Sequence, residues 1–122
     1  MAVFFYDSYA VIEYLQNNQR FVSYFEQHTG ILSYVNLLEI YYSVLQESGN
    51  QKADTVFDML YSLVVETSKE CLKKAMQFRL LHKKNNLSYA DCLGYHLALE
   101  KGIKFLTGDI QFKNFPHVEF VK

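Results

Sequence analysis

The sequence contains one proline, no tryptophan and only two cysteines. Cys71 and Cys92 do not have the spacing of a metal-binding motif, and we expect both to be reduced residues of the core. No apolar run is long enough to cross a bilayer, and no basic segment precedes the apolar residues at the amino terminus. We therefore expect a cytoplasmic protein that does not associate with a membrane.

The chain also lacks an excess of charge of either sign. Its 12 basic and 13 acidic residues give a net charge of -1, which argues against strong non-specific nucleic-acid binding by the whole surface. The densest basic positions, from Lys73 to Lys84, are most simply a solvated helix face, although a local basic patch remains compatible with this balance. The absence of a glycine-rich phosphate loop and of a serine elbow argues against a nucleoside triphosphatase and a serine hydrolase.

Hydrophobic residues, in contrast, make up half of the 122 residues, which suits one domain spanning residues 1–122 with a substantial core. Segments of strand type alternate with segments of helical periodicity. The predicted strands are residues 2–6, 31–35, 63–66, 103–106 and 118–121, and the predicted helices include 17–27, 52–61 and one that Ser68 caps and that continues to Lys83. This alternation predicts βαβ units, a parallel sheet and helices on both of its faces.

The stretch from Ser88 to Asp109 predicts a helix, a tight turn, a strand and an acid, in that order. Ser88 is a helix-capping residue, and Asp91 stands three positions later, where the acid of a capping box is usual. Apolar residues then recur at helical spacing as far as Gly102, a typical helix stop. Asp109 follows the apolar run 103–106 and is expected at the carboxyl end of that strand.

Two further acids stand where a strand gives way to a helix. Asp7 follows the run 2–6 and is a good N-cap for the next helix. Asn36 is predicted to cap the helix after the second strand, which puts Glu39 at the capping-box position. The apolar neighbours of Glu39 give this carboxylate a desolvation cost, which a metal ion or another cation would offset. A structural cap and a functional acid therefore both stay open for Asp7 and Glu39.

One edge of the predicted sheet collects four acids, Asp7, Glu39, Asp91 and Asp109. Right-handed crossovers bring the carboxyl ends of parallel strands and the starts of the following helices to the same edge. Taken singly, three of these acids could be caps and Asp109 could be a turn residue. Together they would raise one another's pKa unless a cation neutralises them. An all-oxygen ligand set favours Mg²⁺ or Mn²⁺ over Zn²⁺, and such a site suits phosphoryl chemistry.

These residues, in this order, resemble the PIN domain family. The matching motifs span nearly the whole chain: Asp7-Ser8 after the first strand, Glu39 in NLLE, Asp91 in YADCLGYHLA, and Thr107-Gly108-Asp109 ahead of Phe112. The resemblance implies an α/β protein with a three-layer α/β/α PIN-like fold around a central, mainly parallel sheet. It also implies an endoribonuclease that depends on Mg²⁺ or Mn²⁺ and hydrolyses RNA phosphodiester bonds.

The same resemblance implies roles for individual residues and for partners. The metal ion and its waters would be held by four acids, Asp7, Glu39, Asp91 and Asp109. Ser8 and Thr107 match polar positions that support the acids, and we expect them to hydrogen-bond Asp7 or Asp109. A chain this small is similar to the VapC-type toxins of toxin–antitoxin pairs, which implies a homodimer and a cognate antitoxin protein that inhibits it.

The sequence departs from the family pattern at two positions. Gln111 stands where some relatives carry a further acid, and Gly108 where a basic or amide residue is usual.

Two other classes of function are alternatives to a nuclease. The first is a PIN-like binding or assembly module without catalysis; loss of an acid would favour it, and none is lost. The second is a receiver-type phosphotransfer domain, which calls for another acid next to Asp7, where Ser8 stands instead.

Overall fold

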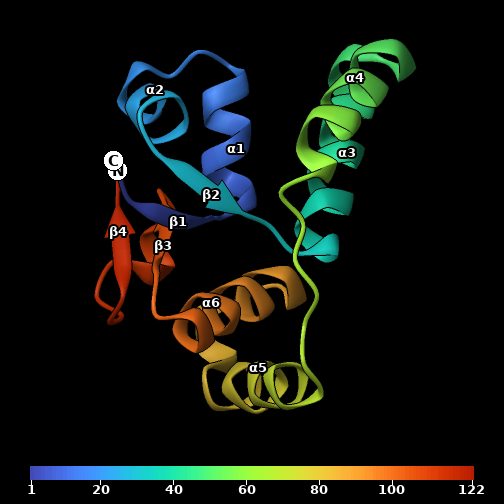
Figure 1. Ribbon diagram of the computed structural model, residues 1–122. Coiled ribbons are helices and arrows are strands. Elements are labelled where there is room, and N and C mark those ends of the chain that lie inside the picture. The colour runs from blue at the N-terminus through green and yellow to red at the C-terminus, as the bar shows by residue number, and fades with distance from the viewer.

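The computed structural model describes residues 1–122 and contains a four-stranded sheet in which every neighbouring pair is parallel (Figure 1). The strands are β1 (Val3–Tyr6), β2 (Thr29–Ile31), β3 (Lys104–Thr107) and β4 (Val118–Phe120), in the order β2-β1-β3-β4. β1 and β3 are distant in sequence but are direct neighbours, with Tyr6 paired to Leu106. Their carboxyl ends therefore lie side by side.

Six α-helices cover this sheet and leave two separate cores. They are α1 (Ser8–Leu15), α2 (Gln19–Glu26), α3 (Tyr34–Ser48), α4 (Asn50–Tyr61), α5 (Lys69–Leu81) and α6 (Tyr89–Lys101), with 3-10 turns η1 (Lys83–Asn85) and η2 (Ile110–Phe112). Figure 1 shows α1 and α2 above the sheet, α5 and α6 below it, and the α3–α4 pair to one side. The predicted three-layer α/β/α fold is confirmed.

The alternation of side chains along β1 explains why both faces are covered. Phe4 and Tyr6 enter the core shared with α1 to α4, whereas Phe5 enters the core shared with α5 and α6. Consecutive strand residues point to opposite faces, so an unbroken apolar run is suited to a strand buried on both sides. Cys71 and Cys92 are free and buried in the second core, as predicted. No helix combines the length and the apolar character that a membrane span requires.

The second strand and third helix lie earlier than predicted. β2 covers Thr29–Ile31 rather than 31–35, because Gly30 can pair within a strand while the Tyr6 ring occupies the space of its missing side chain. α3 then begins at Tyr34, since the Ser33 hydroxyl accepts a hydrogen bond from the Asn36 backbone N–H at 3.2 Å. The prediction that Asn36 caps this helix was wrong, and Glu39 therefore does not occupy a capping-box position.

The predicted strand at 63–66 was also wrong, because this segment forms only one isolated parallel bridge, between Leu32 and Val64. Two turn hydrogen bonds still tie Leu63 and Val64 to the end of α4. On the other side, Leu32 is followed at once by Ser33, the cap of α3, so there is no further backbone to pair with. The helix capped by Ser68 ends at Leu81 rather than at Lys83.

Candidate metal-binding acid site

Asp7 lies at the carboxyl end of β1, next to the end of β3. Its backbone N–H donates to the Leu106 carbonyl at 3.1 Å, which continues the pairing of the two strands. The side chain is 1 % exposed, and its Oδ2 accepts a hydrogen bond from Thr107 Oγ1 at 2.6 Å. Its Oδ1 is buried and has no hydrogen-bond partner. Asp7 stands at the N-cap position of α1 but makes no side-chain capping bond, so capping does not explain its carboxylate.

Thr107 links Asp7 to a second acid in this corner, Asp109. The Thr107 hydroxyl donates to Asp7 and accepts from the Asp109 backbone N–H at 3.0 Å. The Asp109 carboxylate accepts from the Gln111 backbone N–H at 3.0 Å and thereby starts η2. Asp109 therefore acts as a turn residue, one of the two roles open to it from the sequence, and only its Oδ1 takes part in the turn.

Glu39 reaches the same region from the second turn of α3. Its Oε1 accepts a hydrogen bond from Ser8 Oγ at 2.7 Å, across 31 positions of sequence. The hydroxyl of Ser8, which was expected to support Asp7 or Asp109, thus supports Glu39 instead. Ser8 is the first residue of α1, and this bond fixes the start of α1 against α3.

Asp91 fulfils the predicted capping box of α6. The Ser88 hydroxyl accepts from the Asp91 backbone N–H at 3.0 Å, and Asp91 Oδ2 accepts from the Ser88 backbone N–H at 2.8 Å. Gly102 ends the helix in the left-handed conformation at φ 67°. The structural role of Asp91 is therefore established, while Oδ1 receives no hydrogen bond within the chain.

The pKa values of Asp7, Glu39 and Asp91 are raised, partly by repulsion between neighbouring carboxylates. Burial, followed by repulsion from Asp91 and then from Asp109 and Glu39, raises the pKa of Asp7 to about 8 despite the Thr107 hydrogen bond. Burial also raises the pKa of Glu39, where the Ser8 hydroxyl opposes the change and Asp91 adds repulsion. Burial and the charge of Asp109 raise the pKa of Asp91 against the effect of the Ser88 hydrogen bonds. The fold therefore places the predicted acids close enough for their charges to repel one another.

No protein cation balances this group of acids. The only salt bridge in the chain joins Lys104 to Glu119, and no positive side chain contributes to the pKa of Asp7, Glu39 or Asp91. No three of these carboxylates converge closely enough to form a complete ligand cluster. A buried oxygen without a partner, an all-oxygen donor set and uncompensated negative charge nevertheless fit a hard divalent cation.

Two buried residues of this region were not predicted to have a site role. Asn36 is 0 % exposed and its amide donates to Ser8 Oγ at 2.9 Å, so it lies directly behind the Ser8–Glu39 hydrogen bond. Its position three residues before Glu39, on the same helical face, is the sequence signal that could have identified it. The structure also explains why a glycine stands at position 108, because a Cβ there would lie 2.4 Å from the Tyr9 ring and 2.7 Å from the Val121 carbonyl.

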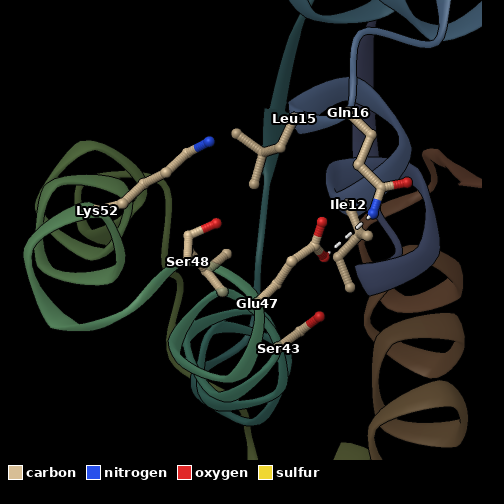
Figure 2. Close-up of a pocket in the computed structure, with 8 residues that line it drawn as sticks. Ile12, Leu15, Gln16, Ser43, Glu47, Ser48 and Lys52 are labelled. Atoms are coloured by element: carbon tan, nitrogen blue, oxygen red, sulfur yellow. Dashed lines mark hydrogen bonds between the residues drawn. The ribbon is translucent and has the colours of Figure 1, made fainter.

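A separate cavity of about 310 Å³ lies further along the groove between α1 and α3, where α4 closes one side (Figure 2). Its wall carries the Gln16–Glu47 hydrogen bond of 3.5 Å, eight residues beyond the Ser8–Glu39 pair on both helices. Lys52 extends into the same space from α4 in Figure 2. None of the predicted site residues lines this cavity, so it is distinct from the acid site.

Comparison with known proteins defines the class to which this fold and this group of acids belong. A model of the PIN domain family matches residues 5–118, which is nearly the whole chain. The chain therefore belongs to the PIN domain family. A comparison with curated proteins gives no match.

Two solved structures share the fold at low sequence identity. A toxin–antitoxin complex from Klebsiella pneumoniae contains a chain with TM-score 0.74 and 14 % identity, and the match covers 98 % of this chain and 96 % of that one. VapBC2 from Rickettsia felis, bound to a DNA fragment from its promoter, gives TM-score 0.73 and 18 % identity, with coverages of 98 % and 99 %. These similarities establish the α/β fold over the whole length of each chain.

Proposed function

We propose that this PIN domain is an endoribonuclease that depends on Mg²⁺ or Mn²⁺ and hydrolyses RNA phosphodiester bonds. The observation that carries the proposal is the Asp7 carboxylate, whose Oδ1 is buried without a partner among acids that have no neighbouring protein cation. A buried carboxylate left in this way is costly unless a cation neutralises it. The donor set consists of carboxylate oxygens, which are the ligands that Mg²⁺ and Mn²⁺ prefer.

Four acids would hold the ion, and their present hydrogen bonds leave oxygens available for it. Thr107 holds Oδ2 of Asp7, and the Ser88 backbone holds Oδ2 of Asp91, so Oδ1 of each has no hydrogen bond within the chain. Gln111 holds one oxygen of Asp109, and Ser8 holds one oxygen of Glu39. In this proposal the supporting groups fix the carboxylates before the ion arrives, which reduces the reorganisation that binding requires.

A bound Mg²⁺ or Mn²⁺ supplies Lewis-acid polarisation of the scissile phosphate and positive charge at the leaving oxygen. The chain's own contribution is to orient carboxylates around the reacting phosphate and to accept the proton of the attacking water. Glu39, Asp91 and Asp109 are the candidates for that proton transfer, because all three are only partly buried whereas Asp7 is sealed from solvent. A general base must reach the proton that it removes, either directly or through one water.

We further propose that residues 1–122 act as a single toxin domain of VapC type, in the cytoplasm, as a homodimer that a cognate antitoxin protein inhibits. The support is the similarity of fold to chains of a toxin–antitoxin complex and of VapBC2. Co-purification of the chain with the product of an adjacent small gene, followed by release of the nuclease on removal of that protein, would test the antitoxin.

The first test is cleavage of a cellular RNA pool by antitoxin-free protein with Mg²⁺, with Mn²⁺ and with EDTA. Asp7→Asn and Glu39→Gln should each lower the rate by more than ~100-fold, beyond the 10–100-fold typical of residues that only support a metal ligand. Glu47→Gln is the matched control, because Glu47 is an exposed acid two turns further along α3 and should leave the rate unchanged. Cleavage that persists in EDTA would contradict the metal-dependent mechanism.

The alternative function, a catalytically inactive binding or assembly module, is favoured by a different result of the same experiment. Folded protein that binds RNA or a protein partner, but cuts no RNA with either ion, would establish the binding module instead. A receiver-type domain would become labelled on treatment with acetyl phosphate, whereas a PIN nuclease would not.

A further inference from the structure

A chain of buried hydrogen bonds runs from the start of α3 to the carboxylate of Glu39. Ser33 and Asn36 are both 0 % exposed, and Ser8 is also buried. Ser33 Oγ lies 2.5 Å from Asn36 Oδ1, Asn36 Nδ2 lies 2.9 Å from Ser8 Oγ, and Ser8 Oγ lies 2.7 Å from Glu39 Oε1. The chain therefore connects Ser33, the cap of α3, through Asn36 and Ser8 to one of the site acids.

The distances define the direction of every bond in this chain. A separation of 2.5 Å between Ser33 Oγ and Asn36 Oδ1 is at the short end of the range for O–H···O and too short for N–H···O. Ser33 must then donate to the Asn36 carbonyl, which turns the Asn36 amide nitrogen towards Ser8. Ser8 Oγ accepts that N–H and has one hydrogen left, which it donates to Glu39.

The capping of α3 does not account for the Asn36 side chain. The cap is the bond from the Asn36 backbone N–H to Ser33 Oγ, and it would form with any residue other than proline at position 36. A fully buried amide is costly unless both of its ends are hydrogen-bonded, and here the nitrogen end is used only to hold Ser8.

We propose that Asn36 is a positioning residue, which commits the hydroxyl hydrogen of Ser8 to Glu39 and thereby fixes Glu39 for metal binding. The inference rests on the proposed function for the role of Glu39, while the hydrogen-bond relay itself can be measured without a metal. Without the Asn36 amide, Ser8 Oγ can rotate away from Glu39 and the carboxylate loses its fixed orientation.

The test is a double-mutant cycle on Asn36→Leu and Ser8→Ala, with two measurements. In the metal-free protein, the ¹³C chemical shift of the Glu39 side-chain carboxyl is measured by NMR. In the same four proteins, the dissociation constant for Mn²⁺ is measured by calorimetry. Ile40→Val is the matched control, because Ile40 is fully buried on α3 and its truncation reduces stability without touching the hydrogen-bond chain.

Each single variant should move the Glu39 signal and weaken Mn²⁺ binding by roughly ten-fold, in the range known for groups behind a metal ligand. The double variant should lose no more than the larger single loss, because both changes break the same relay. An unchanged Glu39 signal in Asn36→Leu, or an equal further loss from Asn36→Leu in the Ser8→Ala background, would overturn the inference. So would an equal loss of affinity in Ile40→Val.

The result also separates this inference from the proposed function. If the wild-type protein cuts no RNA, yet both single variants move the Glu39 signal without additivity, the nuclease proposal fails and the relay stands. If the wild-type protein cuts RNA with Mn²⁺ while Asn36→Leu matches it in signal and affinity, the relay fails and the nuclease stands.

Discussion

At the scale of single residues, Asp7 shows how a functional acid can oppose the stability of the fold that holds it. Burial and repulsion from three other acids raise the pKa of this carboxylate to about 8, although the Thr107 hydroxyl opposes the change. In the unfolded chain the same group releases its proton near an ordinary pKa of about 4. Between these values the folded state binds more protons than the unfolded state, and the free energy of unfolding therefore falls as the pH rises.

We expect Asp7→Asn to stabilise the metal-free protein at alkaline pH, because asparagine can still accept the Thr107 hydrogen bond but carries no charge. In EDTA at pH 8.5 the Tm of the variant should exceed that of the wild type by at least ~4 °C, the equivalent of about 1 kcal/mol. At pH 4 the difference should disappear, because Asp7 is then protonated in the folded state. Thermal unfolding from pH 4 to 9, with the exposed Asp58→Asn as control, measures this; parallel pH profiles for all three proteins would contradict it.

At the scale of elements, helix starts are where local folding signals and site chemistry coincide. Ser68 begins α5 and Ser88 begins α6 with the same bond, in which the serine hydroxyl accepts the backbone N–H three residues later. Only α6 starts at the acid site, because its third residue is Asp91. The two serines therefore make the same capping bond, but only Ser88 also orients an acid of the proposed site.

We expect Ser68→Ala and Ser88→Ala to lose similar stability, about 1 kcal/mol for a lost cap, and to differ in function. Ser88→Ala should also weaken Mn²⁺ binding and RNA cleavage by about ten-fold, because it removes the hydroxyl that holds the Asp91 backbone and so loosens the capping box that orients the Asp91 carboxylate. Chemical denaturation measures the free energy of unfolding of each variant. Calorimetry measures its affinity for Mn²⁺, and the cleavage assay measures its rate of RNA hydrolysis. Equal metal affinity in the two variants would show that Asp91 does not need its capping partner.

At the scale of the whole molecule, a protein with almost no net charge concentrates negative charge at one edge of its sheet. The net charge is -1, yet four acids gather where β1 and β3 end and where α3 and α6 begin, without a salt bridge among them. The acids come from sequence positions 7 to 109, so a cation that joins them restrains almost the full length of the folded chain. A ligand that binds only the folded state stabilises it by mass action.

We therefore expect Mn²⁺ at 100 times its dissociation constant to stabilise the fold by about 2.7 kcal/mol, a Tm increase of roughly 10 °C. EDTA should reverse the increase, and Asp7→Asn should show little of it. Differential scanning calorimetry measures each condition. Na⁺ at equal ionic strength is a control for general screening of charge, because a monovalent ion screens the acids without the multidentate carboxylate binding of a divalent ion. A Tm increase in Asp7→Asn equal to that of the wild type would place the ion elsewhere.

Sequence patterns were reliable where a local interaction decides the structure. The Ser88–Asp91 capping box and the Gly102 stop are set by neighbouring residues, and both occur as predicted. The unbroken apolar run 2–6 predicted a buried parallel strand, and the short apolar run 103–106 predicted the strand that pairs with it. Sequence patterns were less reliable where contacts between distant residues decide the structure. Gly30 pairs in a strand because the Tyr6 ring covers it, and residues 63–66 form a single bridge because Leu32 leads directly into α3.

The sequence by itself therefore determined the α/β class and the alternation of strands and helices outside residues 63–66, and it singled out four acids, because periodicity, caps and family motifs are local properties. Only the tertiary structure decided which hydroxyl supports which acid. Ser8 bonds Glu39 rather than Asp7 or Asp109, Thr107 bonds Asp7, and Asn36 is an amide behind Ser8 rather than a helix cap. These pairings join residues 28 to 100 positions apart, and packing of α1 against α3 and of β1 against β3 brings them together.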